Sequence, residues 1–267
     1  MKPAPTFALF LMLAAPVSMA AAQEPEREEE KEEKPRRIIR VGAGAEIVPD
    51  HVGADGTHWS PLINIDRKRE GGTFVFEAPD ESFGFRVLRL GSIEVGPAAM
   101  LESPRKAKHF PFAIAEVKRT FEVGAFVQSF LGENARVRAE LRKGVNGHEG
   151  LIGQASADLI ARKGDSYVLS VGPRVSWADN KYQQAYFSVT PATAAASGLP
   201  VFNAGKGWRG AGAAASAHFE IAPNFGLYGY GRYERLIGDG GRSPLIRNFG
   251  SRDQMSAGLA LTYSFGL

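Results

Sequence analysis

Apolar and polar residues alternate with a period of two along most of this chain. The pattern is plainest in MSAGLALTYSF, residues 255–265, where Leu259, Leu261 and Tyr263 share one face and small or hydroxylated residues occupy the other. A period of two places successive side chains on opposite faces of an extended strand. The pattern therefore predicts a chain built from β-strands.

Similar alternating segments recur between short turns that contain glycine, asparagine or proline, which is typical of β-hairpins. Each is close to the length that a tilted strand needs to cross a bilayer. We therefore predict about twelve strands. They are expected at residues 38–47, 58–66, 72–78, 82–89, 91–101, 120–131, 135–145, 151–162, 166–177, 207–222, 225–236 and 255–265.

The direction of the apolar face separates a soluble sandwich from a membrane barrel. A soluble core needs bulky side chains packed to high density, whereas the apolar face of residues 211–217 consists of alanines. The opposite faces carry isolated charges among small residues, as the interior of a small transmembrane barrel does. We therefore predict an all-β fold, a transmembrane antiparallel up-and-down β-barrel. Its sheet is expected to close on itself, because an open edge leaves backbone groups unpaired in hydrocarbon.

The charged residues on the inner faces allow two interpretations. A ring of arginines would bias a pore toward anions. Alternatively, arginines and carboxylates present in near-equal numbers would pair in a low-dielectric interior and fill a closed barrel, which is the interpretation we favour. The residues of this lumen charge network are Glu122, Arg136, Arg138, Glu140, Arg142, Asp158, Arg174, Arg232 and Glu234.

The two ends of the chain differ from the strand-rich region. Residues 1–22 combine an early lysine, an apolar run and an alanine-rich cleavage site, which predicts a secretory signal peptide. Residues 23–37 are almost entirely charged and are expected to form a solvated periplasmic tether. The barrel is then expected over residues 38–267. The longest stretch without strand pattern, 186–207, is expected to be an ordered loop at the barrel mouth.

The composition gives no sign of catalytic chemistry. The chain has no cysteine, and its net charge of +3 does not favour nucleic-acid binding. The histidines have no ligand-like spacing, so no metal or cofactor is expected. Ser216 and His218 lie on one face of a strand, but that spacing alone is weak evidence for a nucleophile and base. We therefore predict a protein that is not an enzyme.

The last residues resemble the C-terminal recognition motif of bacterial outer-membrane proteins. In this motif a polar residue and a glycine precede alternating apolar and aromatic positions. The residues that match it are Ser256, Gly258, Leu261, Tyr263 and Phe265. The resemblance implies that the barrel assembly machinery reads this strand. The chain departs from the motif by continuing to Gly266 and Leu267 beyond the aromatic residue.

A more specific resemblance covers most of residues 38–265. The segments VGAGAEIVPDHVGADGTHWSPLINI (41–65), QAYFSVTPATAAASGLPVFNAGKGWRGAG (184–212) and RYERLIGDGGRSPLIRNFGSRDQMSAGLALTYSF (232–265) resemble the MltA-interacting protein/OmpV family. The first departs from the family at His51-Val52, where the family has a tyrosine before its glycine.

The family resemblance implies a protein of the cell outer membrane, surrounded by outer-membrane lipid. It further implies a non-enzymatic scaffold that joins murein-processing enzymes, since one family member links a lytic murein transglycosylase to a peptidoglycan synthase. A small-bore solute channel and an adhesin-like surface barrel are the alternative functions.

Overall fold

The computed structural model describes residues 36–267, so the expected signal peptide and nearly all of the charged tether lie outside the described residues. The described part is built from strands, with short helices in the connections. The strands are β1 (Arg37–Pro49), β2 (Thr57–Arg69), β3 (Phe83–Gly84), β4 (Leu88–Leu90), β5 (Ile93–Glu102), β6 (Thr120–Phe130), β7 (Ala135–Val145), β8 (Leu151–Lys163), β9 (Tyr167–Ala178), β10 (Gly207–Ala222), β11 (Phe225–Leu236) and β12 (Asp253–Gly266). The helices are α1 (Asn180–Phe187), α2 (Pro191–Ser197), α3 (Gly238–Arg242) and α4 (Pro244–Phe249), with a 3-10 turn at Ala107–His109.

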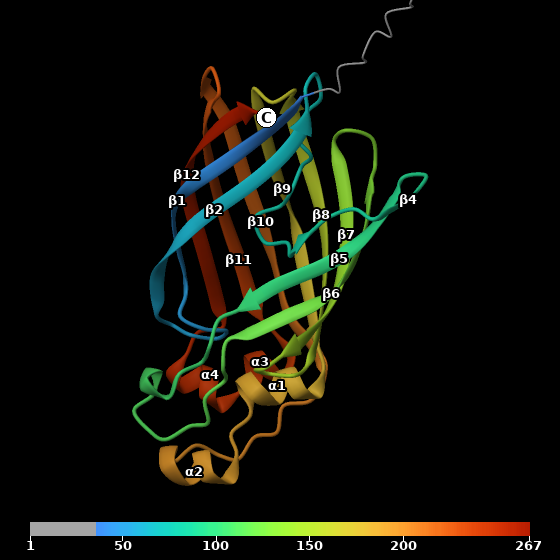
Figure 1. Ribbon diagram of the computed structural model, residues 1–267. Helices are drawn as coiled ribbons and strands as arrows, with labels where there is room; N and C mark the ends of the chain where they lie inside the picture. The colour runs from blue at the N-terminus through green and yellow to red at the C-terminus, as the bar shows by residue number, and fades with distance from the viewer. Residues whose placement is uncertain (1–35) are drawn as a thin grey trace, which may run out of the picture. The chain divides into compact units, whose positions relative to one another are not determined.

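The strands form one antiparallel sheet that curls around a central space (Figure 1). Its order is β2-β1-β12-β11-β10-β9-β8-β7-β6-β5-β3, and β4 also pairs with β5. The first strand and the last lie side by side, from Ile38 opposite Gly266 to Ile47 opposite Ala257. This arrangement confirms the predicted all-β antiparallel barrel.

The sheet carries its apolar side chains on the outside. On β7, Val137 and Leu141 are 41% and 52% exposed, whereas the adjacent Arg136 and Arg142 are 1% and 2% exposed. A soluble protein would bury the valine and leucine and expose the arginines. The inverted pattern is that of a wall with lipid on its outer face and a polar interior.

The two ends of the barrel have different connections. Three hairpins turn at one end within a few residues, between β6 and β7, β8 and β9, and β10 and β11, and this end also holds the start of β1 and the end of β12. The opposite end carries the longer connections and all four α-helices of the described chain (Figure 1). In outer-membrane barrels short turns face the periplasm and long loops face outward. The helical end is therefore the extracellular end.

No helix within residues 36–267 is both long enough and apolar enough to cross a bilayer.

The sheet does not close on itself as expected, because its hydrogen bonding is interrupted between β2 and β3. Within the described residues β2 pairs with β1 alone, and β3 pairs with β5. The predicted strand at 72–78 is wrong, since these residues join no sheet, and the one predicted at 82–89 is reduced to the fragments β3 and β4. We refer to this interruption as the seam.

Residues 72–82, which we call the inner segment, run inside the barrel instead of in its wall. The backbone N–H of Phe74 donates to Asp165 Oδ1 at 3.0 Å, and the guanidinium of Arg136 lies 4.6 Å from the ring of Phe76. Buried and exposed side chains alternate along residues 73–78, and a turn follows at 79–80. The residues buried in it are Phe74, Phe76, Ala78, Asp80 and Ser82.

Helix α1 closes the extracellular mouth with aromatic side chains. Tyr182, Tyr186 and Phe187 are fully buried, and they form an apolar cluster with residues of β8, β9 and β11. The helix begins at Asp179, whose side chain accepts a hydrogen bond from the backbone N–H of Tyr182 at 3.0 Å.

Helix α2 lies within residues 186–207, the segment in which we expected an ordered loop. Its first turn is fixed by Thr190, whose hydroxyl accepts from the backbone N–H of Thr193 at 3.2 Å, and by Pro191. It ends at Gly198, which has a φ of +73° that other residues rarely adopt.

The lipid-facing position of β12 can be tested by comparing arginine at two exposed leucines. Leu259 lies mid-strand and Leu267 lies beyond the strand end, and both are exposed. We expect Leu259→Arg to lower the free energy of unfolding in lipid vesicles by about 2–4 kcal/mol, because a charge at mid-bilayer depth is costly. Leu267→Arg should have much less effect. Equal losses for the two variants would contradict a membrane-spanning β12.

Candidate functional site

The barrel interior holds all nine residues of the lumen charge network. They come from five strands, β6, β7, β8, β9 and β11, whose inner faces converge on the same space. All are buried except Arg232, which is half-buried. The network divides into three groups, and in each group one carboxylate pairs with two or more cationic side chains.

The first group is built on Glu122 of β6 and Glu140 of β7. Arg142 donates from Nε to Glu122 Oε2 at 2.9 Å and also pairs with Glu140. Arg138 donates from Nε to Glu140 Oε1 at 2.6 Å. The second oxygen of Glu122 lies 2.9 Å from Nε2 of His148. Each buried carboxylate therefore has a partner on both oxygens, which offsets the cost of removing it from water.

The second group ties the inner segment to the wall. Asp158 of β8 lies between Arg136 and Arg174, at 2.9 Å and 2.6 Å. Arg136 also contacts Glu81 at 2.6 Å, and Arg174 contacts Asp80 at 3.0 Å. Because Asp80 and Glu81 belong to the inner segment, the same two arginines bind both the wall and the segment that crosses the lumen.

The third group joins the wall to the extracellular cap. Glu234 accepts from Arg209 at 2.7 Å, from Arg232 at 2.8 Å and from the hydroxyl of Ser176 at 2.7 Å. The other arm of Arg209 donates to the hydroxyl of Tyr182 on α1 at 2.7 Å. The position of α1 over the mouth is thus fixed by a buried ion pair.

Sequence reasoning missed Arg209, Asp80, Glu81 and His148. The alternation of β10 places residue 209 outside, but a bulge between Trp208 and Gly210 turns Arg209 inward. Asp80 and Glu81 were missed because the sequence pattern places them in a turn between two predicted strands, 72–78 and 82–89. His148 lies in the β7–β8 connection, where no periodic pattern exists to read.

Ser216 and His218 both face the lumen but do not contact each other as a nucleophile and base would. Ser216 Oγ lies 2.7 Å from Ser170 Oγ. His218 Nε2 lies 3.0 Å from Thr262 Oγ1, and Arg40 approaches the same ring. Each side chain is therefore occupied by a structural hydrogen bond. No cluster of potential metal ligands occurs within residues 36–267.

The proposed assembly signal lies on β12 at the end near the chain terminus. Leu261, Tyr263 and Phe265 point outward, and Tyr263 packs against Phe225 with ring centroids 4.8 Å apart. Such aromatic residues are enriched at membrane interfaces. Ser256 and Gly258 face the interior.

A histidine pair connects two extracellular loops. His51 follows β1 and His109 lies between β5 and β6, and their rings stack with Nδ1 atoms 3.1 Å apart. Burial lowers the pKa of His51 to about 4, with further contributions from His109 and Arg105, whereas Asp50 and Asp55 act in the opposite direction. The folded loops therefore favour the neutral form of His51.

The ion-pair network predicts a large effect for Asp158→Ala. The substitution leaves Arg136 and Arg174 buried with one partner fewer each, so we expect a loss of about 3–5 kcal/mol in the free energy of unfolding in urea. Asp253→Ala is the matched control, because Asp253 pairs with Arg235 on the exposed surface and water screens that pair. Similar losses for the two variants would show that the lumen pairs do not stabilise the barrel.

The loop contact at His51 predicts loosening in acid. The pKa of His51 is lower in the folded than in the unfolded state. The free energy that favours the folded loops is therefore complete above about pH 6.5, and it decreases by about 3 kcal/mol as the pH falls toward 4. The chain has no cysteine, so an environment-sensitive dye on Ala107→Cys reports this loop alone. Its fluorescence should change over that pH range, and His51→Asn should abolish the change. An unaltered titration in the His51 variant would contradict the assignment.

Comparison with known proteins agrees with this architecture at the level of the family. A sequence profile described as MltA-interacting protein MipA matches residues 41–265. A comparison with curated proteins finds no significant match. One similar solved structure is a NanC porin, with 7% sequence identity and a TM-score of 0.39; the match covers 85% of this chain and 98% of the porin. Another is an outer membrane channel from Pseudomonas putida F1, with 10% identity and a TM-score of 0.40; that match covers 87% of this chain and 96% of the channel. OmpT, an outer membrane protein of Vibrio cholerae, is also similar, with 8% identity and a TM-score of 0.34; the match covers 86% of this chain and 96% of OmpT. Because the profile covers nearly the whole described barrel, the chain belongs to the MltA-interacting protein MipA family.

Proposed function

We propose that this outer-membrane β-barrel protein is a non-enzymatic scaffold that binds murein-processing enzymes at the periplasmic face of the membrane. The observation that carries the proposal is the occupied lumen. The inner segment is held across it by the contacts of Asp80 and Glu81 with Arg174 and Arg136. A barrel filled in this way is suited to presenting surfaces rather than to passing solutes.

The pairing of the lumen charges also favours a scaffold over an anion channel. A selective pore requires charges that are free to contact the permeating ion. Here Arg136, Arg138, Arg142 and Arg174 each pair with at least one buried carboxylate. The aromatic side chains of α1 cover the extracellular mouth.

The partner class follows from the family and from charge. The family is named for interaction with MltA, and we extend an interaction with murein-processing enzymes to this chain. The charged residues 24–36 precede β1 in the sequence, and we propose that they contact a soluble partner. During biogenesis, we assign residues 256–265 to recognition by the barrel assembly machinery.

Conductance separates the scaffold from the small-bore channel. The full-length protein should be silent in planar bilayers, and a variant lacking residues 73–81 should give discrete currents because the inner segment is gone. Discrete currents from the unaltered protein that decrease with Arg174→Ala would support the channel instead.

The scaffold itself is tested by crosslinking in intact cell envelopes. A lytic murein transglycosylase or a peptidoglycan synthase should be recovered with the protein above the level found with an unrelated barrel of similar size. Replacing the acidic residues between 24 and 33 with glutamine should reduce that recovery if the tether carries the contact. Failure to recover either enzyme class would remove the support for a murein scaffold.

A further inference from the structure

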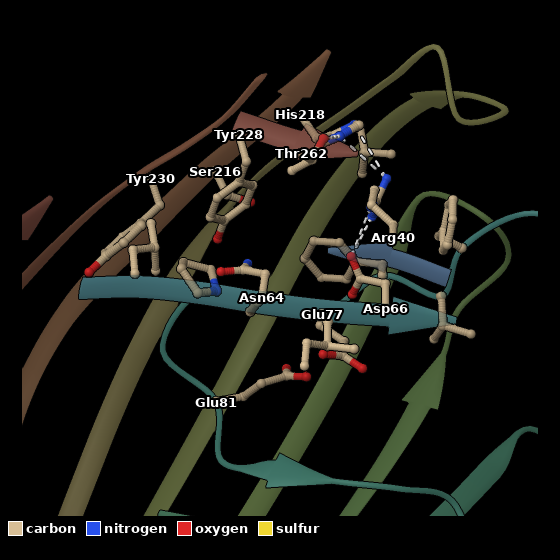
Figure 2. Close-up of a pocket in the computed structure, with 18 of the residues that line it drawn as sticks. Arg40, Asn64, Asp66, Glu77, Glu81, Ser216, His218, Tyr228, Tyr230 and Thr262 are labelled. Carbon is tan, nitrogen blue, oxygen red and sulfur yellow. Dashed lines mark hydrogen bonds and ion pairs between the residues drawn. The ribbon is translucent and has the colours of Figure 1, made fainter. Parts of the chain in front are cut away.

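A cavity of about 350 Å³ lies inside the barrel beside the seam (Figure 2). One wall is formed by Asn64 and Asp66 of β2, and another by Tyr228 and Tyr230 of β11. The inner segment forms a third side, from which Glu77 and Glu81 project into the same space. The inner segment thus separates this cavity from the arginines of the opposite wall.

The cavity opens sideways at the seam. Its lining includes four exposed apolar side chains, Ile63 and Ile65 of β2, Val75 of the inner segment and Phe83 of β3. These residues come from both sides of the interrupted hydrogen bonding. The rim is therefore apolar and lies where the wall meets lipid, whereas the interior of the cavity is polar.

Charge around the cavity is unbalanced toward the negative. Asp66 is neutralised by Arg40 at 2.8 Å, and Glu81 by Arg136 at 2.6 Å. Within residues 36–267 the carboxylate of Glu77 has neither an ion-pair nor a hydrogen-bond partner, although it is exposed to the cavity. The unpaired carboxylate of Glu77 therefore leaves the cavity with an uncompensated negative charge, which attracts a cation.

The remaining lining suits a cation that carries an apolar group. The aromatic residues Tyr228 and Tyr230 also line the cavity, and aromatic rings attract ammonium groups. The rim offers aliphatic and aromatic surface. Small-molecule sites commonly combine a mainly apolar lining with a few placed polar groups.

We propose that this cavity binds an amphipathic organic cation, with its ammonium group at Glu77 and its apolar part directed through the seam. An inorganic cation would leave the apolar rim unused, and an anion would face Glu77 unfavourably. The site is independent of the scaffold function, because it lies inside the barrel and not on the periplasmic surface.

The test uses 2-phenylethylammonium as the probe and the full-length barrel in zwitterionic nanodiscs, with affinity measured by calorimetry. Glu77→Gln should weaken binding by about tenfold or more, because a charge-assisted hydrogen bond is lost. Glu133→Gln, in the exposed β6–β7 turn, is the matched control and should bind as the unaltered protein does. Heat-modifiable gel mobility verifies that each variant is folded.

Two further measurements exclude a change in shape as the cause. The uncharged analogue 2-phenylethanol should bind the unaltered protein and Glu77→Gln with the same weak affinity. Val75→Trp, which fills the rim, should weaken binding of the ammonium probe while Glu77 is kept. No binding to the unaltered barrel, equal binding to Glu77→Gln, or an equal loss for the alcohol would each overturn the proposal.

Discussion

Every arginine on the inner wall must find a carboxylate, and this constraint determines how the barrel is filled. The outer face is apolar because it meets lipid, so the polar side chains have to occupy the interior. There they cannot form an ordinary hydrophobic core, and unpaired charges would be costly. Among the wall residues, Asp158 is the carboxylate that pairs with both Arg136 and Arg174. The inner segment supplies the additional carboxylates, Asp80 and Glu81, and is therefore retained inside the barrel.

Most of the wall could be predicted from the sequence, because alternation is a direct consequence of strand geometry. β12 is an example, with Leu259 outside and Ala260 inside. The same signal failed at residues 72–78. Alternation reveals that a segment is extended, but it does not distinguish a strand in the wall from an extended segment in the lumen. Both have one face against protein.

The candidate site was only partly predictable for the same reason. Charges on regular strands, such as Arg138 and Glu140, occupy the inner face as their parity requires. Arg209 does not follow this parity, because a single bulge turns its side chain from the outer to the inner face of β10. Nothing in the local composition reveals that bulge. The pairing with Tyr182 depends on a helix that lies some 27 residues earlier in the chain. Only tertiary structure brings such groups together.

The seam also bears on the order in which the barrel can be assembled. β1 pairs with β12, so the wall is incomplete until the end of the chain has been placed beside its beginning. An enclosed segment would ordinarily have to be threaded into the finished barrel, and native chains avoid threading. The inner segment escapes this difficulty because it joins β2 to β3, the two unpaired edges of the sheet. The inner segment can therefore enter the lumen through the gap between β2 and β3 after the other strands have formed.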